Sequence, residues 1–136
     1  MAEDDNRRLL RARDTIDRHF AEPLDLERLC RVACMSEAHF IRSFRAAFGE
    51  PPHRYLQRRR IERAMFLLRT TETSITDICF QVGYGSLGTF SRTFADVVGE
   101  SPTSFRARGA LPPVPTCFVK QWTRPSSIGQ ERRSGA

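Results

Sequence analysis

Two arginines occur in the same local pattern, Phe-x-Arg-x-Phe, once around Arg42 and once around Arg92. If both segments are helical, the two phenylalanines share one face, and the arginine between them projects from the opposite face. A guanidinium group is a planar fork of donors that can bind O6 and N7 of a guanine together. The two arginines are therefore candidates for reading bases in the major groove of DNA.

The charge of the whole chain is compatible with such a partner. It holds 22 Lys and Arg against 16 Asp and Glu, and Lys120 is the only lysine. An excess of arginine suits phosphate groups, although some basic proteins bind no nucleic acid. At 136 residues the chain has room for one ordinary domain or two small subdomains, and we expect no separate sensor domain.

The residues that could support catalysis or metal binding do not form a usable pattern. We find no pairing of a nucleophile with a base and no glycine loop that would cradle a phosphate. The four cysteines, Cys30, Cys34, Cys79 and Cys117, form no CxxC pair and lie near no pair of histidines. Cys30 and Cys34, four residues apart, leave a redox or metal pair open, but buried thiols in a reducing compartment are favoured. We therefore expect no enzyme activity, no metal and no cofactor.

The sequence also bears on where the protein works. No apolar run approaches the length of a membrane span, and the charged start MAEDDNRR lacks the apolar stretch of a signal peptide. We expect a protein of the cytoplasm, associated with the nucleoid, that makes no membrane contact.

Cap and turn signals divide the first 107 residues into about seven short helices, with no convincing period-2 strand. The predicted fold class is therefore all-α. Ser36 and Ser86 are predicted N-caps, and Gly49 and Gly99 are predicted left-handed stops. Spacing and caps place the helices at about residues 6–20, 26–33, 37–48, 52–69, 75–82, 87–98 and 102–107.

The two halves of the chain repeat each other. LERLCRVACMSEAHFIRSFRAAFGEPPHRYL aligns with ITDICFQVGYGSLGTFSRTFADVVGESPTSFR, 49 residues apart at Cys30 and Cys79 and 50 apart from Ser36 and Ser86 onward. Each half is a short helix, a tight turn and a capped second helix, which is the order of a helix-turn-helix.

The repeat predicts how the chain is organised. We expect a first helix-turn-helix subdomain at 6–50, a long linker helix at 51–70, a second subdomain at 71–107 and an extended tail at 108–136 rich in Pro, Gly and Ser. A linker of about 18 residues is on the order of 27 Å long, against ~34 Å between successive major grooves. One monomer could then place both second helices, 37–48 and 87–98, in adjacent grooves of tilted or bent DNA.

Three stretches, MSEAHFIRSFRAAFG, RRIERAMFLLRTTETSITDICFQVGYGS and TFSRTFADVVGESPTSFR, resemble the DNA-binding domain of the AraC/XylS family of bacterial transcriptional regulators. The resemblance covers about residues 12 to 107. It implies two helix-turn-helix subdomains joined by one long helix, a monomer on double-stranded promoter DNA, and control of transcription through RNA polymerase. The start at Met1 favours a small stand-alone regulator over a fragment of a larger one.

The expected DNA contacts come from the buried stripes and from this resemblance. Residues opposite the phenylalanines, and the matching family positions, predict base contacts by Ala38, Ile41, Arg42, Leu87, Gly88, Ser91 and Arg92. Phosphate contacts are predicted for Ser36, His39, Arg45, Arg54, Arg58, Arg59, Ser86 and Thr89. The run Gln57 to Arg60 could equally be a solvated helix face.

The second recognition helix is the weaker of the two in this prediction, because it carries only one arginine. Gly88 would permit close backbone approach, and Leu87 could meet a thymine methyl group. The leading hypothesis is a sequence-specific transcriptional regulator, an activator. The alternative is a protein-interaction module that docks RNA polymerase or another regulator and binds DNA weakly. It is motivated by the weak second helix and by Phe118, Val119 and Trp122 in the tail.

Overall fold

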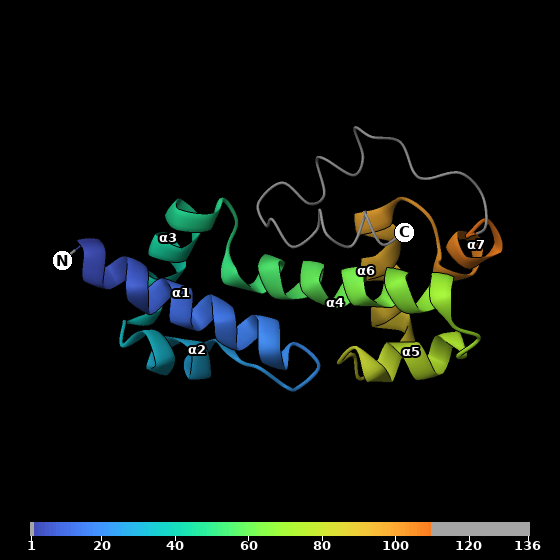
Figure 1. Ribbon diagram of the computed structural model, residues 1–136, viewed down its shortest axis with the longest axis horizontal. Helices are drawn as coiled ribbons and strands as arrows, with labels where there is room; N and C mark the ends of the chain where they lie inside the picture. Colours follow the sequence, from blue (N-terminus) through green and yellow to red (C-terminus); the bar gives the residue numbers. More distant parts are fainter. Residues whose placement is uncertain (1, 110–136) are drawn as a thin grey trace. The chain divides into compact units, whose positions relative to one another are not determined.

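The computed structural model describes residues 2–109, which form seven α-helices and no strand (Figure 1). This confirms the all-α prediction. The tail beyond Gly109, with Cys117 and its apolar residues, lies outside the described residues. The helices are α1 (Ala2–His19), α2 (Leu26–Ala33), α3 (Glu37–Phe48), α4 (Pro52–Thr70), α5 (Ile75–Gln81), α6 (Leu87–Val98) and α7 (Pro102–Ala107).

The observed helix ends follow the predicted caps closely. Ser36 Oγ accepts a hydrogen bond from His39 N at 3.3 Å, and Ser86 Oγ accepts one from Thr89 N at 3.1 Å. The main difference is α1, which begins at Ala2 rather than near Asn6. Acidic residues in a first turn favour the positive end of a helix, and Asp4 also pairs with Arg8 at 2.8 Å.

The described residues divide into two compact units, one up to Arg59 and one from Arg60 onward. In the first unit, α1 packs on α2 and α3 (Figure 1). Its core contains Leu9, Ala12, Ile16, Leu29, Cys30, Ala33, Phe40, Phe44, Tyr55 and Leu56. In the second unit, α6 packs on α5 and α7. Its core contains Ile61, Ala64, Leu67, Leu68, Ile78, Cys79, Val82, Tyr84, Phe90, Phe94, Val98 and Phe105.

The sequence repeat reappears in the packing of the aromatic rings. In the first unit, Phe44 meets Tyr55 edge to face, with ring centres 5.7 Å apart. In the second unit, Phe94 meets Phe105 in the same way at 5.6 Å. Tyr55 and Phe105 are 50 residues apart, so each recognition helix packs on the helix that follows it through matched rings.

The turn inside each helix-turn-helix is also repeated. Met35 N donates to Cys30 O at 3.1 Å, and Tyr84 N donates to Cys79 O at 3.0 Å. Both turns pass through a left-handed residue, Cys34 with φ 55° in the first and Gly83 with φ 104° in the second. Glycine adopts this conformation at no steric cost, whereas a residue with a Cβ does not.

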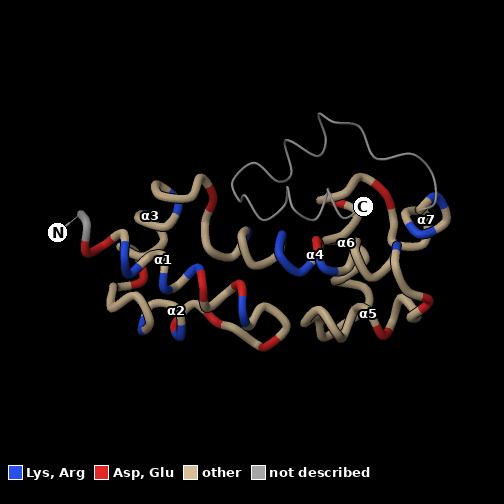
Figure 2. Tube along the Cα trace, in the orientation of Figure 1, with Lys and Arg blue, Asp and Glu red and all other residues tan. Residues whose placement is uncertain are grey.

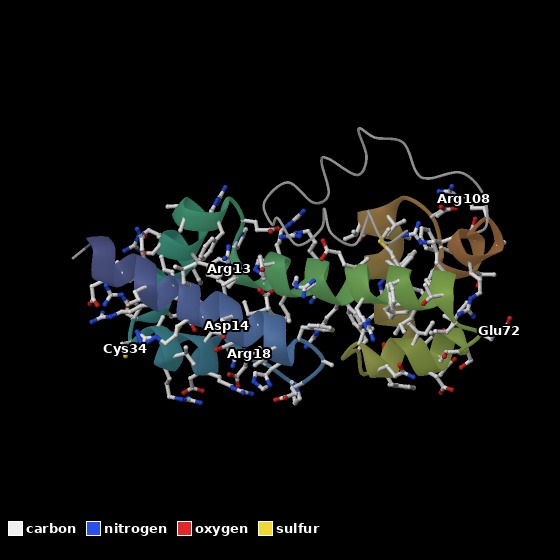
Figure 3. The ribbon with its side chains drawn as sticks, viewed as in Figure 1. Arg13, Asp14, Arg18, Cys34, Glu72 and Arg108 are labelled. Carbon is white, nitrogen blue, oxygen red and sulfur yellow. The ribbon has the colours of Figure 1, made fainter. Side chains whose placement is uncertain are left out.

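This turn corrects the prediction that the cysteines are buried thiols. Cys30 and Cys79 are buried, as predicted, and burial raises the pKa of each thiol. Cys34 is exposed, because it follows the last residue of α2 and forms its left-handed cap (Figure 3). No group of three His, Cys, Asp or Glu side chains within residues 2–109 could hold a metal ion. None of the helices described is long and apolar enough to cross a membrane.

Candidate nucleic-acid interface

The first recognition helix, α3, presents one buried and one exposed face. Phe40 and Phe44 are fully buried. Ala38, Arg42 and Arg45 are exposed on the other face, while Ile41 is half-buried beside them. The helix therefore brings the predicted base-reading residues together on the side away from the core, with two guanidinium groups available for a partner.

The second recognition helix, α6, repeats this arrangement with fewer charges. Leu87, Gly88 and Arg92 are exposed, and Ser91 is half-buried. Arg92 Nη1 lies 3.7 Å from the point where a Cβ on Gly88 would stand, so the guanidinium group reaches back over the first turn of α6. This face offers one cation, a backbone without a side chain at Gly88, and an apolar side chain at Leu87, which is 41% exposed.

The first turns of both helices hold most of the remaining phosphate candidates. Ser36 and Ser86 are exposed and use their hydroxyl oxygens as caps. The Ser86 hydroxyl also donates to Thr89 Oγ1 at 3.1 Å. His39 lies 3.4 Å from Ser43 Oγ through Nδ1 and 3.6 Å from Asp5 Oδ2 through Nε2, which ties it to α1. Exposed helix starts of this kind suit a phosphate group.

Two of the predicted phosphate contacts do not fit the structure. Arg58 is buried and donates to Glu50 Oε2 through Nε at 3.0 Å and through Nη2 at 2.6 Å. Arg59 is buried too, and its Nε donates to Asp17 Oδ1 at 2.9 Å. Both guanidinium groups are therefore occupied by partners within the first unit, and loss of either partner would leave a buried charge uncompensated. Arg54, by contrast, is exposed and stays a phosphate candidate.

The interpretation of the arginine run as a solvated face is also wrong for Arg58, Arg59 and Arg60. Arg60 is buried over the ring of Tyr84, with its guanidinium carbon 5.6 Å from the ring centre. Burial lowers the pKa of Arg60 and raises the pKa of Tyr84 to about 12. Hydropathy alone could not find these roles, because an arginine becomes buried only where the tertiary fold supplies partners for its charge.

Asp17 shows no local pattern that distinguishes it from a surface acid, yet in the structure it has two partners on α4. Its Oδ1 accepts hydrogen bonds from Tyr55 Oη at 2.8 Å and from Arg59 Nε at 2.9 Å. The acid therefore links α1 to α4 within the first unit. Its partners lie 38 and 42 residues away in the sequence, so local pattern gave no sign of them.

The charge distribution differs between the two helix-turn-helix motifs. α2 carries Arg28 and Arg31, whereas α5 carries Asp77 and no cation (Figure 2). No lysine or arginine occurs from Thr70 to Ser91. Phe80, on α5, is 54% exposed and stands where the repeat has Arg31. The second motif thus offers DNA a narrower basic surface and leaves an acidic and apolar surface on α5.

Known proteins resemble this chain in sequence. A family model described as a helix-turn-helix domain matches residues 29–108, more than half of the chain. An uncharacterised HTH-type transcriptional regulator of Staphylococcus aureus (strain COL) is 37% identical over 93 residues, covering 68% of this chain. An uncharacterised HTH-type regulator of Haemophilus influenzae is 37% identical over 86 residues, covering 63% of this chain. The chain spans only 12% and 29% of these relatives.

Solved structures resemble the chain over most of its length. The DNA-binding domain of AdpA, solved in complex with a target DNA, has a TM-score of 0.72 at 30% identity, covering 77% of this chain and 96% of that one. A transcriptional regulator from Chromobacterium violaceum, one of the AraC-type DNA-binding domain-containing proteins, has a TM-score of 0.71 at 28% identity, covering 79% of this chain and 96% of that one. The C-terminal domain of AraT from Geobacillus stearothermophilus gives 0.70 at 32%, covering 73% and 83%.

Proposed function

Because the chain belongs to the AraC-type family of helix-turn-helix transcriptional regulators, we propose that it binds double-stranded promoter DNA in a sequence-specific way. The observation that carries the proposal is the pair of recognition helices, each with an exposed arginine opposite a fully buried phenylalanine pair. A helix of this type enters the major groove with its exposed face toward the base edges.

In this proposal α3 supplies most of the hydrogen-bonded specificity. Arg42 binds a guanine through two hydrogen bonds, while Ala38 and Ile41 make apolar contact with neighbouring bases. Arg45 and Arg54, both exposed, bind phosphates and fix the position of the helix on the duplex. His39 and the Ser36 hydroxyl add phosphate contacts at the start of the helix.

We propose that α6 reads the second half-site with less charge and closer contact. Arg92 binds a guanine, and Leu87 meets a thymine methyl group. Gly88 allows the backbone to approach the base edges, with Ser91 beside it. Ser86 and Thr89, both exposed at the start of the helix, bind the phosphate backbone.

We also propose that one copy of the chain places α3 and α6 in adjacent major grooves, as a monomer on DNA. The functional division would then be a first subdomain at 6–50, a linker helix at 51–70 and a second subdomain at 71–107. Each helix-turn-helix has its own core and its own reading face, so neither needs a second copy to complete it.

Selection of bound duplexes from a random pool tests the DNA-binding proposal. We expect enrichment of an asymmetric site with two half-sites about one helical turn apart, and a steep fall of affinity with added salt. Recovery of no preferred sequence would contradict the proposal. Enrichment of only one half-site would contradict the use of both helices.

A second activity is favoured by the surface of α5. Phe80 is exposed, and α5 carries no cation. Asp77 on α5 and Glu72 just before it are also exposed. Such a surface suits a basic and apolar protein partner better than a phosphate backbone. We propose that the chain activates transcription in the cytoplasm, on nucleoid DNA, by contacting RNA polymerase through this surface.

The two activities can be separated by substitution at matched positions of the repeat. We expect Phe80→Ser to lower transcription from the selected promoter while DNA affinity is unchanged. Arg31→Ala, at the equivalent position of α2, serves as the comparison, and we expect it to leave polymerase contact unchanged. If the wild-type chain bound RNA polymerase and showed no DNA preference, the protein-interaction module would be the better description.

A further inference from the structure

Two ion pairs occupy equivalent places in the two repeats. Glu50 and Glu100 each follow the glycine that ends a recognition helix, and Arg58 and Arg108 each stand eight residues later. In the first pair, Arg58 Nε and Nη2 lie 3.0 and 2.6 Å from Glu50 Oε2. In the second pair, Arg108 Nε lies 2.7 Å from Glu100 Oε2, and Nη2 binds the same oxygen. The same three atom types meet in both units.

Each pair joins the end of a recognition helix to the helix that follows it. Glu50 lies directly after α3 and its stop at Gly49, and Arg58 is on α4. Glu100 lies directly after α6 and its stop at Gly99, and Arg108 caps α7 (Figure 3). In each unit, an ion pair outside the hydrophobic core therefore anchors the C-terminal end of the recognition helix to the helix that follows it.

The aromatic contact provides a second attachment in each unit, and in the first unit the guanidinium carbon of Arg58 also lies 5.1 Å from the centre of the Tyr55 ring. Phe44 in the middle of α3 packs on Tyr55 of α4, and Phe94 in the middle of α6 packs on Phe105 of α7. One attachment is apolar and central, and the other is polar and terminal. These attachments add to the packing of α3 on α1 and α2 and of α6 on α5, and so constrain the direction of each recognition helix.

We propose that Glu50 with Arg58, and Glu100 with Arg108, are positioning residues that set the angle at which each recognition helix presents its arginine to DNA. This rests on the proposed function, since the angle matters only if α3 and α6 read bases. Neither pair contacts the bases. They act through Arg42 and Arg92, whose hydrogen bonds to a guanine require correct placement of the guanidinium fork.

The two ion pairs differ in their exposure to water. The side chains of Arg58 and Glu50 are 3% and 12% exposed, whereas those of Arg108 and Glu100 are 39% and 18% exposed. Salt and water screen an exposed pair far more than a buried one. The ion pair between Arg108 and Glu100 should therefore weaken first as ionic strength rises. Discrimination between specific and scrambled sequence at the α6 half-site should then fall before discrimination at the α3 half-site.

The proposal is tested with Arg58→Gln, Arg108→Gln and a matched control, Asp14→Asn. The control breaks an exposed pair within α1, where Arg18 Nε lies 3.1 Å from Asp14 Oδ2 (Figure 3). Affinity is measured at one salt concentration for the selected duplex, for duplexes with either half-site scrambled, and for random duplex. We expect Arg58→Gln to lower discrimination at the α3 half-site about tenfold, and Arg108→Gln to lower it at the α6 half-site about threefold. Affinity for random duplex should be unchanged in both variants. The control variant should bind every duplex as wild type does.

Arg58→Gln leaves a partly buried carboxylate unpaired, which can prevent folding. The double variant Glu50→Gln with Arg58→Gln removes both charges and keeps amide groups at the same positions. Far-ultraviolet circular dichroism selects the variants that fold. Unchanged discrimination in folded variants of both units would overturn the proposal.

Hydrogen exchange of the DNA-free protein separates this proposal from the proposed function. Each variant should speed exchange in the last turn of the recognition helix of its own unit and leave the other unit unchanged. If wild type shows no sequence preference while these exchange rates respond as expected, the proposed function fails. The ion pairs would then still be shown to anchor the ends of the recognition helices. Unchanged exchange in both helices would contradict the claim that the ion pairs anchor them.

Discussion

The two helix-turn-helix motifs have nearly the same skeleton and different surfaces. Caps, stops, aromatic contacts and terminal ion pairs recur about 50 residues apart, from Ser36 and Ser86 to Arg58 and Arg108. The exposed faces have diverged, since α3 carries Arg42 and Arg45 and α6 carries Arg92 and Asp96. A duplicated core with unequal surfaces is suited to reading two unlike half-sites.

The largest expected effect tests whether the two cores are equivalent. Phe44 and Phe94 are both fully buried at matching positions. Truncating either to alanine leaves a large cavity, so we expect Phe44→Ala and Phe94→Ala each to cost about 3–5 kcal/mol of unfolding free energy. Native-state hydrogen exchange assigns the loss to one unit. Losses that differ by more than twofold would show that the cores are not equivalent.

Much of this skeleton could be predicted from sequence because its signals are local. A serine cap, a phenylalanine every fourth residue and a glycine stop lie within 14 residues, from Ser36 to Gly49, and together define α3. The burial of Arg58 and Arg59 could not be predicted in this way. Asp17, which binds Arg59, belongs to a different helix, and only the tertiary fold brings the two together.

The matched signal for Arg58 was nevertheless present in the sequence. Glu50 and Glu100 align in the repeat, and Arg58 and Arg108 follow each by eight residues. Arg58 and Arg108 are 50 residues apart, which is the offset of the repeat from Ser36 and Ser86 onward. The base and phosphate contacts remain predictions, because exposure shows only which side chains are available to DNA.

A smaller effect sharpens the comparison of the two reading faces. Ala38 and Gly88 occupy the same position of the repeat, and a Cβ on Gly88 would meet only Arg92 Nη1, at 3.7 Å. We expect Gly88→Ala to raise the unfolding free energy by about 1 kcal/mol and Ala38→Gly to lower it by about as much. Chemical denaturation measures both changes. A destabilised Gly88→Ala would mean that α6 is strained at this point.

That pair of variants also tests the close backbone approach proposed for α6. If Gly88 lies against base edges, the added methyl group weakens specific binding although the protein becomes more stable. A titration of the selected duplex with Gly88→Ala measures this. Unchanged specific affinity would place Gly88 away from the bases.

The two turns offer a comparison with a smaller energy. Cys34 adopts φ 55°, where the repeat has Gly83 with φ 104°. We expect Cys34→Gly to stabilise the first unit by about 0.5 kcal/mol, because glycine removes the steric cost of the left-handed conformation. Gly83→Ala should destabilise the second unit by ~1 kcal/mol or more. Thermal unfolding checks both, and a stabilising Gly83→Ala would contradict the equivalence of the turns.

The smallest expected effect is the pH dependence of the stability that the more exposed ion pair, Glu100 with Arg108, contributes. The hydrogen bond from Arg108 lowers the pKa of Glu100 below its ordinary value of 4.5. A carboxyl whose pKa is lowered by folding stabilises the fold above the ordinary pKa, and this contribution disappears as pH falls through the lowered pKa. Between neutral pH and about pH 4.5 the contribution should therefore be intact, and it should be lost at lower pH.

The variant Glu100→Gln isolates that contribution from the other carboxyl groups. Its thermal unfolding temperature should lie below that of wild type at neutral pH, and the difference should shrink as the solution becomes more acidic than about pH 4.5. A difference that stays constant down to pH 2 would show that Glu100 adds no charge-dependent stability.

The central claim is that α3 and α6 each read DNA through one arginine, and titration of the selected duplex with Arg42→Ala and Arg92→Ala tests it most directly. We predict that Arg42→Ala loses ~1–3 kcal/mol of specific binding and relaxes the preference at one base position. Arg92→Ala should do the same in the other half-site with a smaller loss. Affinity for random duplex should change far less. Equal affinities of wild type and both variants for the selected and the random duplex would contradict the account.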